Sequence, residues 1–230
     1  MRKRVARGLV ACALVAAGAA RAVDTGTVRG SIQLFKKGLL GGPKESDDRS
    51  GVVVYVTGFT RPAPAAALEL NQKKQTFVPR VLAVVKGQSV VFPNRDDIYH
   101  NVFSVSPLAT FDLGQYKGKD TPRRVTFDKP GLVPVYCNIH PQMLSYVVVL
   151  ENDAFALTQK DGRFEIPHLP AGAFELNAWT PGAQRVSQPV SIAPGQVVDA
   201  TLRIDQTERI APHKRKDGSD YPPDAEYEPD

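Results

Sequence analysis

The sequence predicts an all-β protein built from two β-sandwiches, and three observations support that fold class. Apolar residues alternate with polar ones or form short runs, which is the pattern of strands. Gly, Pro, Asn and Asp bound these runs, and the 19 prolines and 18 glycines are spread along the chain as turn signals. After residue 22, almost nothing has the periodicity of a helix.

The strand pattern can be followed from residue 26 to residue 204. Strands are expected near residues 26–34, 51–57, 80–86, 88–93, 99–105, 122–127, 131–137, 145–150, 162–166, 172–179, 186–192 and 197–204. Two segments interrupt the pattern. Residues 38–50 predict an exposed loop, and residues 61–75 predict a linker with one helical turn. Short strands in this number are typical of two sandwiches.

Composition places the chain among soluble globular proteins. Its 230 residues allow one or two domains with a sizeable buried core. The hydrophobic content of 42% and the charged content of 23% are ordinary for such proteins. These values argue against a fully disordered, collagen-like or multi-span membrane protein.

The N-terminus has the three parts of a secretory signal peptide. Residues 1–8 carry four cations and no acid, residues 9–20 are apolar or small, and Ala20-Arg21-Ala22 gives a cleavage site. We therefore expect residues 1–22 to be a signal peptide, and the protein to be periplasmic with no stable membrane span after cleavage. The alternatives are a lipid anchor on Cys12 and a retained signal anchor.

Loss of residues 1–22 changes the charge and the sulfur content. The formal charge of +5 belongs to that segment, because 24 Lys and Arg remain against 24 Asp and Glu. No nucleic-acid partner is therefore expected. One cysteine (Cys137) and one methionine (Met143) remain. An exported protein with a lone cysteine has no internal disulfide, so Cys137 is buried and inert, paired between chains, or bound to a metal.

Four metal-ligating side chains stand out in this sequence. Residues 137–143 read Cys-x2-His-x2-Met, with Cys137 ending a predicted strand and His140 and Met143 on the turn that follows. His100 lies at the start of another predicted strand. One thiolate, two imidazoles and a distant thioether are the ligand set of a blue-copper electron-transfer site. Zinc is the alternative metal, although methionine suits it poorly.

The segment from residue 76 to residue 150 resembles the cupredoxins, the family of plastocyanin, pseudoazurin and amicyanin. The matching residues are 77–79, 86–96, 100–103, 130–131 and 136–143. The resemblance implies a Greek-key sandwich with one type 1 copper. The spacing of two residues between His140 and Met143 is most similar to that of amicyanin. Because the segment is short for this family, an edge strand is expected from residues 50–58.

The cupredoxin resemblance also implies a role for each residue of the site. His100, Cys137 and His140 would be equatorial ligands, and Met143 the axial ligand. Asn101 would brace the two ligand loops from the second coordination sphere. Neither His168, in a proline-flanked turn, nor His213, in the charged tail, is assigned a role.

The remaining strands resemble the carboxypeptidase regulatory-like domain, a small transthyretin-like sandwich. The matching segments include Gly26-Thr27-Val28-Arg29-Gly30 and residues 161–179. We expect this sandwich to be split into residues 25–60 and 151–206, with the cupredoxin inserted between them; a tandem arrangement is the alternative. Trp179 is expected in its core. The acid-rich, proline-containing tail, residues 207–230, predicts disorder.

These features favour an electron carrier over an enzyme, because the second sandwich has no nucleophile–base pair. The expected partners are redox proteins of the cell envelope. They would dock around His140, and four cations would steer an acidic partner. The docking residues are Pro141, Gln142 and Leu144, and the cations are Lys117, Lys119, Arg123 and Arg124. Copper storage or delivery is the alternative function, and an adhesive or carbohydrate-binding role for the second sandwich is a third.

Overall fold

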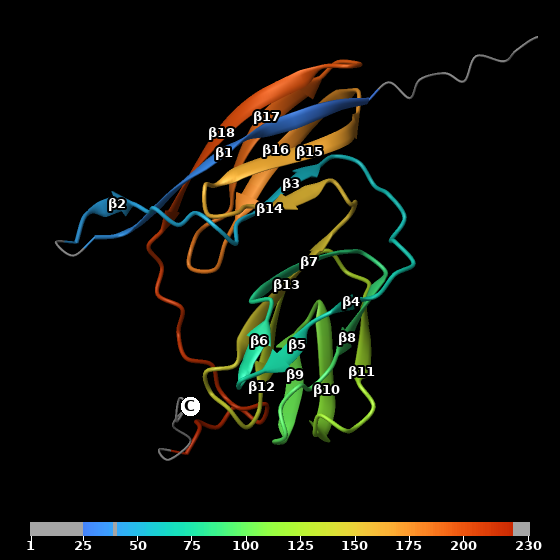
Figure 1. Cartoon of the computed structure of the whole chain (residues 1–230), viewed down its shortest axis with the longest axis vertical. Helices are drawn as coiled ribbons and strands as arrows, with labels where there is room; N and C mark the ends of the chain where they lie inside the picture. Colours follow the sequence, from blue (N-terminus) through green and yellow to red (C-terminus); the bar gives the residue numbers. More distant parts are fainter. Residues whose placement is uncertain (1–24, 39–40, 223–230) are drawn as a thin grey trace, which may run out of the picture.

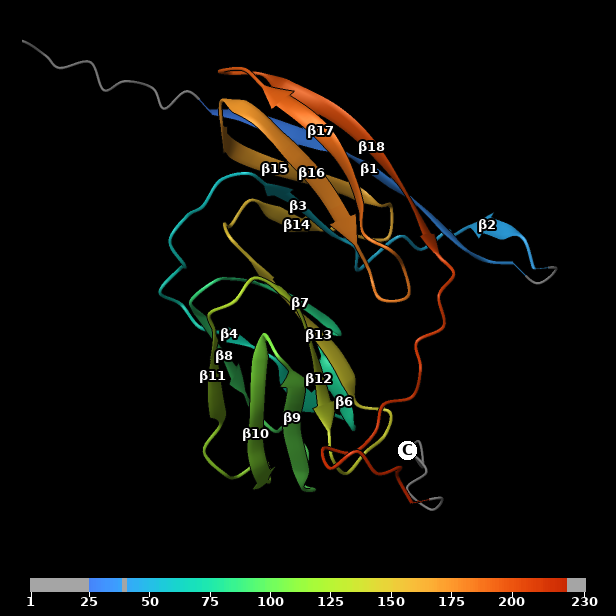
Figure 2. The ribbon, with the colours of Figure 1, turned by 180° about the vertical axis from the view of Figure 1, so that it is seen from behind.

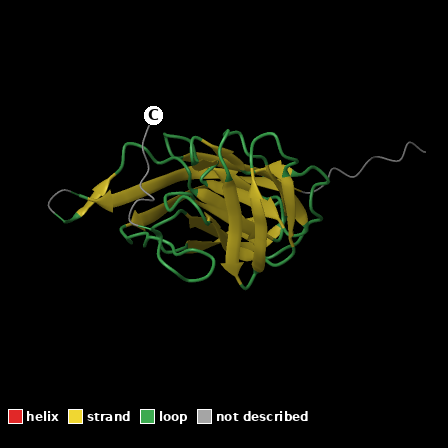
Figure 3. Ribbon diagram, turned by 90° about the horizontal axis from the view of Figure 1, so that it is seen from below, coloured by secondary structure: helices red, strands yellow, loops and turns green. Residues whose placement is uncertain are grey.

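The computed structural model describes residues 25–38 and 41–222, so the predicted signal peptide lies outside the described part. Every regular element in this part is a strand, which confirms the predicted all-β class (Figure 3). The described residues accordingly contain no helix that could cross a membrane. The strands are β1 (Thr25–Lys37), β2 (Pro43–Glu45), β3 (Val53–Thr57), β4 (Leu68–Glu69), β5 (Asn71–Lys73), β6 (Thr76–Val78), β7 (Val81–Val85), β8 (Gln88–Phe92), β9 (His100–Ser106), β10 (Ala109–Tyr116), β11 (Arg123–Phe127), β12 (Gly131–Cys137), β13 (Leu144–Leu150), β14 (Phe155–Leu157), β15 (Arg163–Pro170), β16 (Gly172–Trp179), β17 (Val186–Ile192) and β18 (Val197–Gln206).

The strands at the two ends of the chain form one sandwich, which we call the split sandwich (residues 25–57 and 155–206). One sheet has the order β15-β1-β18, with β2 paired to β1, and the other has the order β14-β3-β16-β17. Strand β1 runs parallel to β18, so the first strand is held by the last (Figure 1). Gly30 is required in β1, because a Cβ there would lie 1.7 Å from the carbonyl oxygen of Ala200.

The strands between them form a second body, which we call the inserted sandwich (residues 68–150). Its larger sheet has the order β10-β9-β12-β13-β7, and its smaller sheet has the order β11-β8-β4. A hairpin of β5 and β6 lies beside them. Alternation along β12 buries Val133, Val135 and Cys137, and their neighbours are partly exposed. Strand β12 therefore ends with Cys137 facing the core.

A separate apolar cluster joins the two sandwiches. It combines Val53 and Tyr55 of β3 with Val81 and Ala83 of β7 and with residues of β13. Trp179 is partly buried at this junction, and its ring lies 5.4 Å from that of Tyr146. Trp179 therefore packs between the two bodies rather than in the centre of the split sandwich.

Several elements differ from the sequence-based expectations. The strand at residues 53–57 pairs with β14 and β16 of the split sandwich, so it does not supply an edge to the inserted one. That edge comes from β4, within the segment expected to be a linker, where strands replace the expected helical turn. The expected loop at residues 38–50 contains the short strand β2.

The described part of the C-terminal segment contacts the inserted sandwich. Residues 207–222, here called the strap, form no regular element, but they run from the end of β18 down the side of the inserted sandwich (Figures 1 and 2). Their contacts include hydrogen bonds to Cys137 and Asn138. The composition of residues 207–230 predicts disorder; residues 207–222 form these specific contacts, and residues 223–230 lie outside the described part.

Candidate metal centre

Two neighbouring strands bring the predicted ligands together at one end of the inserted sandwich. His100 is the first residue of β9 and Cys137 is the last residue of β12. These strands are antiparallel, and Cys137 is the register partner of Val102. The start of β9 and the end of β12 therefore lie at the same edge of the sheet. Both His100 and Cys137 are 0% exposed.

The loop after Cys137 folds back over its own start. The backbone N–H of Met143 donates to the carbonyl of His140 at 3.1 Å, and that of Cys137 donates to the carbonyl of Met143 at 3.3 Å. The ligand spacing of three residues therefore becomes a tight turn. His140 lies on this turn, half-buried, and its ring stands 4.8 Å from that of His100 at an interplanar angle of 65°.

Three donor atoms from His100, Cys137 and His140 face one another. The two histidine Nδ1 atoms are 3.0 Å apart. The Sγ atom of Cys137 lies 3.9 Å from the Nδ1 of His100 and 3.7 Å from the Nδ1 of His140. Bonds of ~2.0 Å to nitrogen and ~2.3 Å to sulfur, spread evenly in one plane, would separate the donors by ~3.5 Å and ~3.7 Å. The three side chains therefore fit one first-row metal ion with little movement.

Met143 is carried by the same turn as His140. Its side chain is fully buried and belongs to the apolar cluster that contains Cys137. A methionine in a core is ordinary packing by itself. Here it follows His140 by three residues on a turn closed by the hydrogen bond between the two, so the turn that carries His140 also carries a buried thioether.

Asp96 fixes the orientation of His100, a role that the sequence analysis did not assign. Its Oδ2 lies 2.9 Å from the Nε2 of His100. Asp96 is itself held by the backbone N–H groups of Lys74 and Gln75, at 2.7 and 3.0 Å. An ionised carboxylate only accepts hydrogen bonds, so Nε2 carries the proton and Nδ1 presents its lone pair to the centre.

Asn101 links the two ligand segments mainly through its backbone. Its carbonyl accepts a hydrogen bond of 2.8 Å from the N–H of Asn138. Its side chain turns the other way, and its Nδ2 donates to Asp112 at 2.6 Å and to the carbonyl of Gly114 at 3.2 Å. The residue thus connects the start of β9, the ligand loop and β10.

Burial sets the charge state of the donors in the metal-free protein. It lowers the pKa of His100, against the opposing effect of Asp96, and it raises the pKa of the Cys137 thiol. Burial, followed by repulsion from His100, lowers the pKa of His140 to about 4. Near pH 7 the centre therefore holds two neutral imidazoles and a thiol, and a bound metal would displace the thiol proton.

The other two histidines lie outside the donor triangle. His168 is in β15 of the split sandwich, with a positive φ of 58°. His213 belongs to the strap, and its ring packs on Tyr136 at 4.5 Å. His213 therefore lies beside strand β12 without joining the three donors. In residues 25–38 and 41–222, His100, Cys137 and His140 are the one group of three such side chains close enough to hold a metal ion.

Several solved structures are similar to part of this chain. No family model and no curated protein matches the chain. A purple cupredoxin from Nitrosopumilus maritimus is 20% identical, with a TM-score of 0.33 over 36% of this chain and 99% of that one. Amicyanin from Paracoccus versutus is 23% identical, with a TM-score of 0.33 over 42% of this chain and 97% of that one.

A copper-containing nitrite reductase from Thermus scotoductus is also similar. It is 25% identical, with a TM-score of 0.36 over 42% of this chain, and the match spans a quarter of the reductase. All three TM-scores are low, so the metal assignment rests on the side chains of the site itself. The structural neighbours include cupredoxins, as the sequence of residues 76–150 predicts, whereas the likeness of the split sandwich to the carboxypeptidase regulatory-like domain stays a prediction.

Proposed function

We propose that this chain is a type 1 copper protein that carries single electrons between redox proteins of the cell envelope. The observation that supports the proposal is the meeting of one sulfur and two imidazole nitrogens, from His100, Cys137 and His140, within 4.8 Å of one another. In the proposal these three residues and Met143 would hold one copper ion per chain, and Asp96 and Asn101 would support them from behind.

The donor set favours copper over zinc. A buried thiolate and a thioether are soft ligands that suit Cu(I), and imidazole suits both oxidation states. Structural zinc sites use four thiolate or imidazole ligands, and catalytic ones often include a carboxylate. Here the carboxylate nearest to the centre, Asp96, is engaged by the far nitrogen of His100. Copper bound by this set supplies reversible one-electron chemistry.

The protein's own contribution is to hold the donor side chains in place through backbone pairing. His100 and Cys137 sit on paired strands, and hydrogen bonds close the turn that carries His140. Donors held in this way cannot rearrange when the charge at the centre changes, which keeps reorganisation small. His140 is half-buried whereas His100 is fully buried, so His140 offers the shorter route to the surface.

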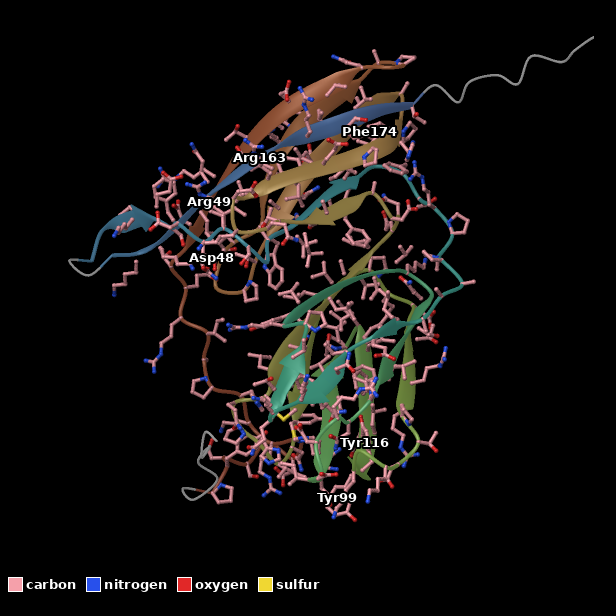
Figure 4. The ribbon with its side chains drawn as sticks, viewed as in Figure 1. Asp48, Arg49, Tyr99, Tyr116, Arg163 and Phe174 are labelled. Carbon is pink, nitrogen blue, oxygen red and sulfur yellow. The ribbon has the colours of Figure 1, made fainter. Side chains whose placement is uncertain are left out.

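A basic edge beside the centre would steer an acidic partner. Lys117 and Lys119 follow the end of β10, Arg123 and Arg124 begin β11, and all four are exposed. The Lys117 ammonium lies 4.4 Å from the ring of Tyr99, which is 49% exposed at the tip of the inserted sandwich (Figure 4). A positive field at this tip would raise the association rate with acidic redox proteins at low salt.

The periplasmic location is part of the proposal, because it depends on the signal peptide predicted at residues 1–22. Mass spectrometry of protein exported from cells tests it. A chain that begins at Val23 supports a released periplasmic carrier. A lipid on Cys12, or an uncleaved start, would instead give a membrane-anchored protein.

Copper storage or delivery uses the same ligands, and retention of the metal separates it from electron transfer. Copper-loaded protein would be cycled repeatedly with ascorbate and ferricyanide in the presence of a Cu(I) chelator. An electron carrier keeps its copper and its absorption through every cycle, because His100 and Cys137 are fully buried. Loss of copper to the chelator during the reduced phases would favour delivery.

A further inference from the structure

The strap joins the split sandwich to the ligand loop of the inserted one. It begins where the N–H of Glu208 donates to the carbonyl of Gly182 at 3.0 Å, in the split sandwich. Residues 210–213 then line a hollow together with Pro141, Gln142 and Leu144. These three are the residues predicted to dock a partner, so part of that surface is bordered by the chain's own C-terminal segment (Figure 2).

The strap bonds to the ligand loop at two consecutive residues, Cys137 and Asn138. The Tyr221 hydroxyl donates to the carbonyl of Cys137, and the backbone N–H of Lys216 donates to the Oδ1 of Asn138 at 2.8 Å. On the opposite side, the N–H of Asn138 donates to the carbonyl of Asn101. The backbone that follows the cysteine is therefore held from the strap and from β9 at the same time.

Two further contacts orient the strap. The ring of His213 packs on that of Tyr136 at 4.5 Å, and its Nδ1 lies 3.2 Å from the Tyr221 hydroxyl. The Lys216 ammonium pairs with Asp112, whose other oxygen accepts from Asn101. Tyr221 is thus one member of a set of contacts on both sides of Cys137, and its partly buried hydroxyl is aimed at the cysteine carbonyl.

We infer that the strap is a positioning element for the metal centre and that Tyr221 is its principal positioning residue. The inference rests on the proposed copper site. The direction of the Cys137 Cα–Cβ bond depends on the peptide that follows it, and hence on the Tyr221 hydrogen bond. A donor set held at the correct spacing binds metal without first ordering itself, so the strap slows metal loss.

The test compares three full-length chains: the natural one, Tyr221→Phe and Tyr146→Phe. Tyr221→Phe keeps the ring and removes the hydroxyl. Tyr146→Phe makes the same chemical change in β13, where the ring packs on Trp179 and lines a hollow with the first residues of the strap, but its hydroxyl forms no hydrogen bond to residues 137–143 or 207–222. Each is loaded with copper and its absorption spectrum is recorded. It is then reduced, and the rate of Cu(I) transfer to a chelator is measured. The thermal midpoint of each metal-free chain is also compared.

We expect Tyr221→Phe to bind one copper with an altered absorption band and to lose Cu(I) about threefold to tenfold faster, as the loss of one hydrogen bond implies. Tyr146→Phe should match the natural chain in spectrum and release rate, and the thermal midpoint of metal-free Tyr221→Phe should fall by no more than about 4 °C. Equal spectra and equal release rates for all three chains would overturn the positioning role while leaving the copper proposal intact.

A metal-free measurement separates failure of the strap from failure of the copper site. The rate at which a thiol reagent labels Cys137, located by mass spectrometry, reports how firmly the loop covers the sulfur. We expect faster labelling in Tyr221→Phe than in the other two chains. If the natural chain binds no copper, the proposed function fails; faster labelling would then still show the strap holding the loop, and equal labelling would overturn both.

Discussion

Both sandwiches bond buried amides and hydroxyls to the backbone, but among the described residues only the inserted one also gathers metal-ligating donor atoms at one point. Buried Asn152, just before β14, and buried Thr158 of the split sandwich bond to backbone groups of neighbouring segments, so they stabilise the fold. In the inserted sandwich, His100, Cys137 and His140 point donor atoms at one another. Three donors that converge satisfy a cation better than they satisfy each other. The comparison shows that buried polar side chains indicate a ligand site when their donor atoms converge on one point.

Removal of the central sulfur should have the largest effect. In Cys137→Ser a hydroxyl replaces the thiolate, and a neutral oxygen is a poor ligand for Cu(I). We expect complete loss of the intense visible absorption with copper, while the circular dichroism of the β-fold is retained. Retained colour in this variant would refute the ligand assignment.

One substitution in the core of each sandwich should then separate effects on the free energy of unfolding from effects on the visible absorption of the copper-loaded protein. Leu176 is fully buried in the split sandwich, and Leu176→Ala should lower the free energy of unfolding by about 2–5 kcal/mol. The absorption of the folded, copper-loaded protein should not change. The matched change is Met143→Leu, which conserves volume and should cost less than about 1.5 kcal/mol but shift the absorption. Denaturant titration and visible spectra test both, and the opposite pattern would remove the distinction.

Replacement of the Asp96 carboxylate, which bonds to His100, should have an intermediate effect on the affinity for copper. Asp96→Asn allows an amide N–H to face Nε2, which favours the tautomer with the proton on the metal-facing nitrogen. Copper affinity should fall by about 10- to 100-fold. Asp153→Asn is the control, because Asp153 forms an ion pair of 2.7 Å with Arg61 far from the centre. Competition with a chelator measures both, and equal affinities would show that Asp96 does not orient the ligand.

Acid should weaken the inserted sandwich before the split one, which is the smallest of the expected effects. Burial lowers the pKa of both His100 and His140, the latter to about 4. The unfolded chain, with histidine pKa values near ~6.5, binds these protons first as the pH falls. Stability of the metal-free protein should therefore decrease between about pH 6.5 and pH 4.

Hydrogen exchange can locate that pH effect. Amides of β9 and β12 should exchange faster at pH 5 than at pH 7 after correction for intrinsic rates, and amides of β1 and β18 should change less. His140→Gln should reduce the change in β9 and β12. A uniform loss of protection in both sandwiches would contradict the assignment of the effect to the two histidines.

The sequence is informative where the signal is local, and less so where contacts are distant. The spacing of Cys137, His140 and Met143 is visible because one loop carries all three. Strand β10 was missed although Ala109, Phe111 and Leu113 alternate, because the register shifts between Asp112 and Gln115 and breaks the period. The strands β4 to β6 are two or three residues long and show no period.

The supporting contacts of the site could not be predicted for a related reason. Asp96 lies in a turn rich in polar residues, and its bond to His100 depends on how Lys74 and Gln75 close around it. The strap has the composition of a disordered tail, and Tyr221 is one aromatic residue among many charges. Its hydrogen bond to Cys137 spans 84 residues of sequence. No local pattern encodes such a contact.

The most direct test of the central claim is the visible spectrum of the protein with residues 1–22 removed, recorded after addition of Cu(II) and again after ascorbate. We predict an intense blue absorption band at one copper per chain that bleaches on reduction and returns on reoxidation. Absence of the band, or weak colour from loosely held copper, would mean that Cys137 does not bind copper, and would contradict electron transfer as the function.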